Sequence, residues 1–238
     1  MQFRIAFHRQ PITKHVVSAK VISMKNMKRL KIIGLVILGN IIFWLFGLKL
    51  IFKYMKKGSA PCPASISWIV DLPPRKCWMR PILDRVGIKP GETVLELGPG
   101  PGAFTVDAAQ RLQPDGKLIA VDIQPEMIAK VEERVKQAGL TNVETHVASA
   151  YDLPLEDASV DRVFLVTVLP EIPDPVRGLH EIRRVLKPDG VLSTSEEFLD
   201  PDYPRRRTTI QWAEAAGFEL DYSFGNWWVY TLNFRKRL

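Results

Sequence analysis

Cysteine and histidine are scarce in this chain of 238 residues. Cys62 and Cys77 are its two cysteines, and there are four histidines. Two cysteines this far apart, with so few histidines, lack the spacing of a zinc or iron–sulfur site. We therefore expect no bound metal, and two free thiols in a reducing compartment.

Acidic residues are absent from the first 60 positions. Residues 1–60 hold 12 of the 33 Lys and Arg and none of the 26 Asp and Glu. The remaining residues carry 21 basic and 26 acidic side chains, a net charge of −5. The overall charge of +7 thus belongs to the N-terminal segment, and nucleic-acid binding by the rest of the chain is disfavoured.

A long uncharged run follows the basic N-terminus. Ile32 to Leu48 contains no charged residue, and with Lys49 reaching outward it extends to Phe52. About 20 apolar residues suffice for a helix to cross a membrane, and lysines flank this run on both sides. The sequence predicts a basic tail over 1–31, a transmembrane helix over 32–52, a linker over 53–65 and a folded domain over 66–238.

Three alternate glycines mark the centre of that domain. An apolar run over 93–97 is followed by Gly98, Gly100 and Gly102, and then by a segment typical of a first helical turn. A strand, a glycine turn and a helix in this order present backbone N–H groups to a ligand. We expect a polar, nucleotide-like ligand here.

Two kinds of cofactor fit this stretch. Gly98, Gly100 and Ala103 match the dinucleotide pattern, with Asp122 at the distance of a ribose-binding acid. Glu96 argues against that match, because a carboxylate would repel a pyrophosphate but attract a cationic or amino-bearing ligand.

Strand and helix patterns alternate along the domain. This alternation predicts an α/β fold with a doubly wound, mostly parallel, seven-stranded Rossmann-like sheet. Helices are expected over 80–86, 125–138, 175–186 and 207–216, and strands over 93–97, 117–122, 142–147, 161–167, 190–195, 218–222 and 227–234. The last two strands are expected to pair as a closing hairpin.

The acid placed two residues before alternate glycines resembles the cofactor loop of class I S-adenosylmethionine-dependent methyltransferases. Over 85–197 the resemblance extends to the domain shared by ubiquinone/menaquinone C-methyltransferases and many small-molecule and lipid methyltransferases. It implies S-adenosylmethionine as cofactor and a seven-stranded sheet whose last strand is antiparallel.

The resemblance also implies roles for individual residues. Glu96 and the three glycines would border the methionine moiety, and Asp122 would accept hydrogen bonds from both ribose hydroxyls. Ile123 and Met127 would pack on the adenine, Ser149 and Ala150 would lie at its edge, and Val166 would lie near the sulfonium. The alternatives for Asp122 and Met127 are a helix-capping acid and a plain core residue.

Two positions depart from the family pattern. Pro101 stands where Thr or Ser is common, and Ser149 stands where Asp is common. Pro101 offers neither a hydroxyl nor an N–H, and Ser149 accepts a hydrogen bond without charge. Both departures affect the strength of cofactor binding more than the identity of the cofactor.

The sequence contains few candidates for a catalytic base. Glu171 is the best placed acid after the fourth strand, with a surface or capping role as the alternative. The signature of enzymes that methylate amino groups is absent from 169–174. A base is needed only where the acceptor must first lose a proton.

The expected anchor suggests the acceptor. A domain held at a bilayer meets lipid-soluble molecules at high effective concentration, so we expect a membrane-bound methyltransferase acting on a lipid, quinone-like or other small hydrophobic acceptor. Its domain should be cytoplasmic, where the cofactor is made, although the flanking lysines slightly favour the opposite orientation. The alternatives are a tethered S-adenosylmethionine-binding protein without catalysis and a dinucleotide-dependent oxidoreductase.

Overall fold

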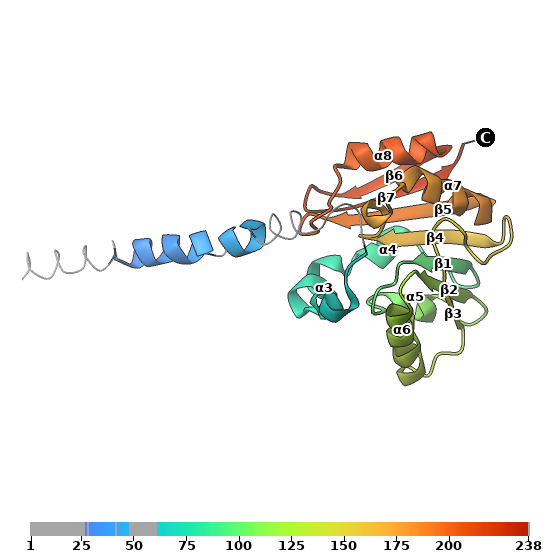
Figure 1. Cartoon of the computed structure of the whole chain (residues 1–238), viewed down its shortest axis with the longest axis horizontal. Coiled ribbons are helices and arrows are strands. Elements are labelled where there is room, and N and C mark those ends of the chain that lie inside the picture. Colours follow the sequence, from blue (N-terminus) through green and yellow to red (C-terminus); the bar gives the residue numbers. More distant parts are fainter. Residues whose placement is uncertain (1–26, 28, 41, 48–60, 238) are drawn as a thin grey trace, which may run out of the picture. The chain divides into compact units, whose positions relative to one another are not determined.

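The structure is a computed structural model that describes residues 27, 29–40, 42–47 and 61–237. The chain divides into two units, Met1–Leu50 and Ile51–Leu238. Figure 1 shows the elements of both units.

The described part of the first unit is helical and apolar. Residues 29–40 and 42 are helical, and a π-helix, η1, spans Phe43–Gly47. Large apolar side chains along it are exposed, Leu35 and Phe43 by 68% and 62%. Within the described residues, none of the helices combines the length and apolar character needed to cross a membrane. Residues 41 and 48–52 of the predicted span, and 53–60 of the predicted linker, lie outside the described residues.

The second unit contains one sheet of seven strands in the order β3-β2-β1-β4-β5-β7-β6. The strands are β1 (Thr93–Leu97), β2 (Lys117–Asp122), β3 (Val143–Val147), β4 (Val160–Val166), β5 (Leu186–Glu197), β6 (Phe218–Gly225) and β7 (Val229–Lys236). Strands β1 to β5 pair in parallel, whereas β7 pairs antiparallel with both β5 and β6. The predicted α/β fold and its closing hairpin are confirmed.

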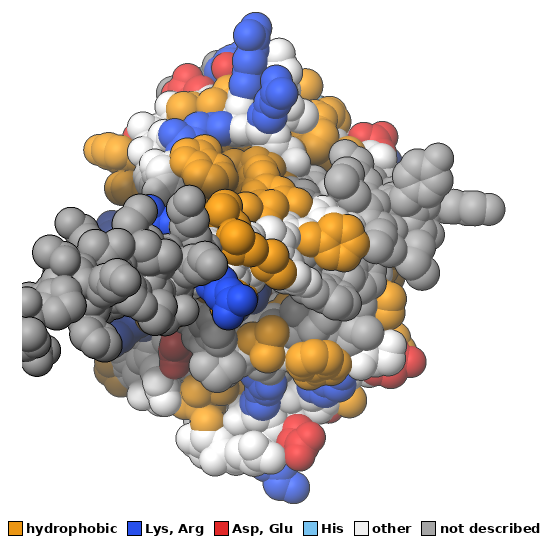
Figure 2. All heavy atoms as spheres, turned by 90° about the vertical axis from the view of Figure 1, so that its left-hand side faces the viewer, with side chains coloured by type: hydrophobic (Ala, Val, Ile, Leu, Met, Phe, Trp, Pro, Cys, Tyr) orange, Lys and Arg blue, Asp and Glu red, His pale blue; other side chains and the backbone are white. Residues whose placement is uncertain are grey.

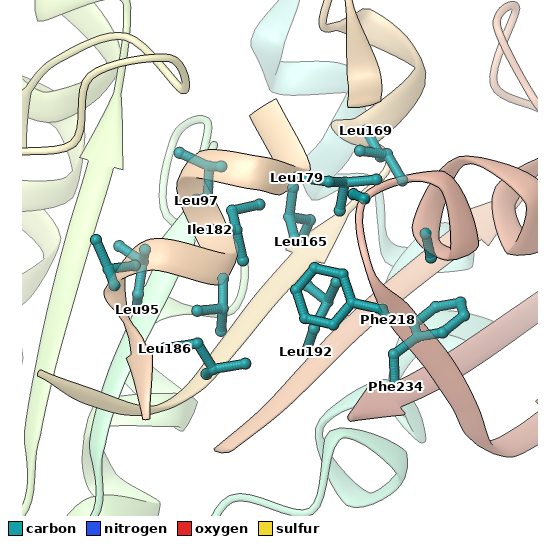
Figure 3. Close-up of a cluster of buried hydrophobic side chains, with 14 of the residues drawn as sticks. Leu95, Leu97, Leu165, Leu169, Leu179, Ile182, Leu186, Leu192, Phe218 and Phe234 are labelled. Carbon is teal, nitrogen blue, oxygen red and sulfur yellow. The ribbon is translucent and has the colours of Figure 1, made fainter. Parts of the chain in front are cut away.

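Helices cover both faces of this sheet. They are η2 (Ala64–Asp71), α3 (Pro73–Met79), α4 (Ile82–Val86), α5 (Thr105–Leu112), α6 (Pro125–Gln137), η3 (Leu169–Glu171), α7 (Pro175–Val185) and α8 (Arg206–Ala215). One buried cluster joins α7 and α8 to the sheet, and a second joins α4 and α5 to the opposite face. Figure 3 shows the first cluster, which includes Leu165, Leu179 and Phe218. Truncating such a side chain to alanine typically costs about 2–5 kcal/mol.

Three element boundaries differ from the sequence expectation. Strand β5 begins at Leu186, which pairs with Val160 of β4; the ladder resumes at Val191, opposite Arg162, so that residues 187–190, expected to form a stop, lie in the register shift between these two pairs. A separate helix, α3, precedes the short helix expected over 80–86, which is α4. Both hairpin strands extend beyond their predicted ends.

Candidate functional site

The glycine turn lies between β1 and α5, where the sequence predicted it. Gly98, Gly100 and Gly102 have φ values of +69°, +55° and +85°, a region that side chains other than glycine avoid. A Cβ on Gly98 would lie 2.5 Å from Cγ2 of Val168, whereas one on Gly100 would meet nothing within 4 Å. The protein therefore leaves no room for a side chain at Gly98, whereas the space beside Gly100 is free.

Asp122 lies beside this turn at the end of β2. Its carboxylate accepts hydrogen bonds from the backbone N–H groups of Gly100, at 3.3 Å, and Gln124, at 2.9 Å. Its side chain is nearly buried, and burial raises the pKa of the carboxyl group, while these N–H bonds lower it. Asp122 thus joins the glycine turn to the residue before α6; the N-cap of α6 is Gln124, and no side chain caps this helix.

Glu96 is the second buried acid of the site. It lies on β1 and accepts a hydrogen bond of 2.6 Å from the hydroxyl of Thr105. Burial raises its pKa to about 8, the Thr105 bond lowers it, and the negative charge of Asp122 raises it. A positive group beside Glu96 would offset the free-energy cost of burying its negative charge and would favour the ionised carboxylate.

The remaining predicted cofactor residues lie at the same edge of the sheet. Val147, next to Ser149 and Ala150, pairs with Asp122, and the N–H of Ala148 donates to the carbonyl of Asp122 at 3.0 Å. Ile123 is 56% exposed, whereas Met127 is buried in α6 with 2% exposed. Ile123 offers a free apolar surface, and Met127 has the burial of a core residue.

Strand β4 brings the other predicted residues to this edge. Val166 pairs with Ser195 of β5 at the carboxyl end of the strand. Thr167 follows with φ of +59°, held by a 2.8 Å bond from its N–H to the carbonyl of Ser195. The sequence analysis missed this strained residue, because a threonine carries no signal for a positive φ. Glu171 lies on η3, and its charge contributes to raising the pKa of Glu196.

Two further acids at the end of β5 were missed. Glu196 is fully buried; the hydroxyl of Thr194 donates to its Oε1 at 3.1 Å, and its Oε2 has no hydrogen-bond partner among the described residues. Burial, with the charge of Asp200, raises its pKa well above the usual range. Glu197 accepts bonds from Arg75 Nε, at 2.5 Å, and Trp78 Nε1, at 3.1 Å. These contacts join α3 to the carboxyl end of β5.

Aromatic rings surround this end of the sheet. The ring centroid of Phe198 lies 5.3 Å from Trp227 and 5.9 Å from Trp228, and Trp228 lies 6.1 Å from Trp78. We call Trp78, Phe198, Tyr203, Trp227 and Trp228 the aromatic cluster. Of the two tryptophans before β1, Trp78 packs against Trp228, whereas Trp68 is 61% exposed.

A cavity of about 450 Å³ opens beside the aromatic cluster. Phe198, Tyr203, Trp227 and Tyr230 form its apolar wall, and Arg205 and Arg206 lie at its polar side. Cavities that hold small organic ligands have volumes of about 300–1,000 Å³ and mostly apolar walls. This cavity therefore has the size and lining for a small hydrophobic molecule.

A family model described as a methyltransferase domain matches residues 88–215, more than half of the chain. Arsenite methyltransferase of Halobacterium salinarum is 39% identical over 115 residues, which are 48% of this chain and 29% of that protein. Demethylmenaquinone methyltransferase of Bacillus cytotoxicus is 31% identical over 122 residues, 51% of this chain and 52% of that protein. The chain thus spans 29% and 52% of the length of these two curated relatives.

Solved structures agree with this match. A SAM-dependent methyltransferase from Aquifex aeolicus has a TM-score of 0.68 and 26% identity, covering 73% of this chain and 98% of that one. The complex of the trans-methyltransferase CalH with SAH, at 21% identity and a TM-score of 0.54, covers 62% of this chain and 52% of that one and shares the fold. S-adenosylmethionine is therefore the cofactor, and a dinucleotide is not. The chain belongs to the methyltransferase domain family, within the class I S-adenosylmethionine-dependent methyltransferases.

Proposed function

We propose that this protein transfers a methyl group from S-adenosylmethionine to a small hydrophobic acceptor, either a lipid or a quinone-like molecule. The observation that carries this proposal is the aromatic-walled cavity at the carboxyl end of β5. Phe198 of the cavity wall directly follows β5, the strand whose Ser195 pairs with Val166 at the carboxyl end of β4. The similarity to demethylmenaquinone methyltransferase, whose name specifies a quinone, supports an acceptor of this kind.

The cofactor residues have distinct roles in this proposal. Asp122 accepts hydrogen bonds from the ribose hydroxyls, and Glu96 with the glycine turn at Gly98, Gly100 and Gly102 borders the cationic methionine moiety. The exposed side chain of Ile123 packs on one face of the adenine. Met127 lies on the buried side of the adenine site. Ser149 and Ala150 lie at the adenine edge, and Val166 lies near the sulfonium.

Methyl transfer then proceeds by in-line displacement. When bound, S-adenosylmethionine would supply a methyl carbon activated by its sulfonium, which a lone pair of the acceptor displaces from sulfur with S-adenosylhomocysteine as the leaving group. Most of the acceleration comes from aligning the two reactants and excluding water. Where the acceptor carries a proton, Glu171 is the candidate base.

The test is turnover of the full chain with methyl-labelled S-adenosylmethionine. An organic extract of membranes is compared with an aqueous metabolite extract. Trp227→Ala removes an exposed tryptophan that lines the cavity, and Trp68→Ala removes one that does not. We expect label in the organic extract, with KM for the acceptor raised about tenfold by the first variant and unchanged by the second. Label confined to the aqueous extract contradicts the hydrophobic acceptor; absence of turnover supports a tethered cofactor-binding protein.

We also propose that the N-terminal segment anchors the protein to a membrane, with residues 66–238 forming the cytoplasmic methyltransferase domain and 53–65 linking the two. The support is the row of exposed apolar side chains on the helix of the first unit, Leu30, Ile32, Leu35 and Leu38 among them. Figure 2 shows one face of the molecule, with hydrophobic side chains near its centre and Lys and Arg side chains around them.

Flotation with vesicles tests the anchor. The full chain should float with phosphatidylcholine vesicles, and replacing Leu35 and Leu38 by lysine should abolish flotation because charges are costly in the bilayer core. Replacing Lys28 and Lys31 by glutamine is the control and should leave flotation intact. Flotation that survives the two new lysines would exclude this segment as the anchor.

A further inference from the structure

A second, larger cavity is lined by residues of η2, α3, α4, α5 and α6. It has a volume of about 720 Å³ and lies between the η2–α4 segment and the outer sides of α5 and α6. Figure 1 shows where these elements lie in the fold. Of the predicted cofactor residues, only Gly102 lines this cavity, whereas Glu96, Gly98, Gly100 and Asp122 do not. It therefore meets the proposed cofactor site at Gly102 alone of these residues.

Arginines dominate the charge of this cavity. Its walls contain four arginines and a single acid, Asp107. Arg75 is bound to Glu197, and Arg111 makes a 2.7 Å ion pair with Asp84 that is largely exposed. Arg80 is exposed on the connection between α3 and α4, and Arg134 Nη1 donates to the carbonyl of Gly102 at 3.4 Å. The walls of the cavity therefore contain more basic than acidic side chains.

Apolar side chains form the other part of the wall. Val70, Met79, Leu83, Phe104 and Val106 line the same cavity. Met79 and Leu83 are almost fully buried, so their surfaces form a fixed floor, whereas Val70, Phe104 and Val106 are half-buried. A ligand that filled this cavity would meet arginines on one side and hydrocarbon on the other.

We propose that this cavity binds an amphipathic molecule with one anionic group, such as an alkyl phosphate or the phosphate end of a lipid. Guanidinium groups of Arg80 and Arg111 bind the phosphate oxygens, because planar N–H pairs match that geometry. The alkyl chain lies against Leu83 and Phe104, where each buried CH₂ contributes about 0.8 kcal/mol at most. The site is separate from the acceptor cavity and does not depend on methyl transfer.

The test is calorimetric titration of the full chain with octyl phosphate below its micelle concentration. Inorganic phosphate and octanol, which correspond to the charged and the apolar part of octyl phosphate, are titrated separately. Arg80→Gln with Arg111→Gln removes two charges from the cavity, and Arg207→Gln removes one exposed charge elsewhere, on α8. Titration with S-adenosylhomocysteine checks that each variant is folded, since neither changed arginine contacts the proposed cofactor residues.

We expect octyl phosphate to bind at least tenfold more tightly than inorganic phosphate or octanol alone. The double variant should weaken that binding at least tenfold, and Arg207→Gln should change it less than twofold. Equal binding of inorganic phosphate would overturn the amphipathic ligand in favour of a free anion. If Arg207→Gln weakened binding equally, the overall charge of the protein, rather than this cavity, would account for the effect. Unchanged binding in the double variant would contradict the proposed site.

Discussion

The two ends of the sheet's carboxyl edge differ in how they are built. At the β1–β2 end, Gly98, Gly100 and Asp122 shape the site through backbone geometry and two N–H bonds within 22 residues of sequence. At the β5–β7 end, Glu197 reaches back across 122 residues to Arg75 and 119 residues to Trp78. The proposed cofactor end is built from a local stretch of sequence, whereas the proposed acceptor end is assembled from distant segments.

The largest expected effect separates two glycines of the cofactor end. Gly98→Ala places a Cβ against Val168 at a positive φ, so we expect a loss of about 3 kcal/mol in the free energy of unfolding. Adding Val168→Ala should remove the clash and leave only the cost of the positive φ. Denaturant unfolding measures both values.

Gly100→Ala is the matched variant. It costs only the positive φ, about 1 kcal/mol, because its Cβ meets nothing within 4 Å. The open space is where the cofactor is proposed to lie, so calorimetry should show cofactor affinity lowered about tenfold. Equal stability losses at Gly98 and Gly100, with unchanged affinity, would contradict the difference between the two positions.

A smaller effect is expected at the acceptor end. Glu197→Gln removes the charge that pairs with Arg75, and both side chains are about nine-tenths buried. We expect a loss of about 2 kcal/mol in stability and a higher KM for the acceptor, with the cofactor Kd changed less than twofold. Asp221→Asn breaks the more exposed pair with Arg235 and should cost less than about 0.5 kcal/mol. Cofactor affinity falling as strongly as acceptor affinity would show that the two ends are not independent.

The smallest effect concerns protons at Glu96. Its pKa of about 8, against 4.5 for the ordinary group, leaves the carboxyl protonated at pH 7; its contribution to stability is fully present below pH 4.5 and is lost progressively as the pH rises from there through about 8. A cation bound beside it favours ionisation, so cofactor binding at pH 7 should release up to one proton. Calorimetry in two buffers of different ionisation enthalpy measures this release. Glu96→Gln should abolish it; release that persists in the variant would place the proton elsewhere.

Sequence patterns predicted the cofactor end and missed most of the acceptor end, for a physical reason. The apolar run before Gly98 and the acid at 122 lie within one strand–turn–helix unit, so local rules place them. The positive φ of Thr167 and the burial of Glu196 depend on the pairing of β4 with β5 and of β5 with β7. Such pairings join segments that no local pattern relates. The arginine-lined cavity likewise draws its walls from several separate elements.

The most direct test of the central claim is calorimetric titration of the full chain with S-adenosylmethionine, S-adenosylhomocysteine and NAD, repeated on Asp122→Ala. We predict micromolar binding of the first two and none of NAD. The variant should weaken binding at least about a hundredfold, because it removes charge-assisted hydrogen bonds to two hydroxyls. Asp115→Ala, an exposed acid before β2, is the control. Binding of NAD alone, or equal S-adenosylmethionine affinity in the Asp122 variant, would contradict the account.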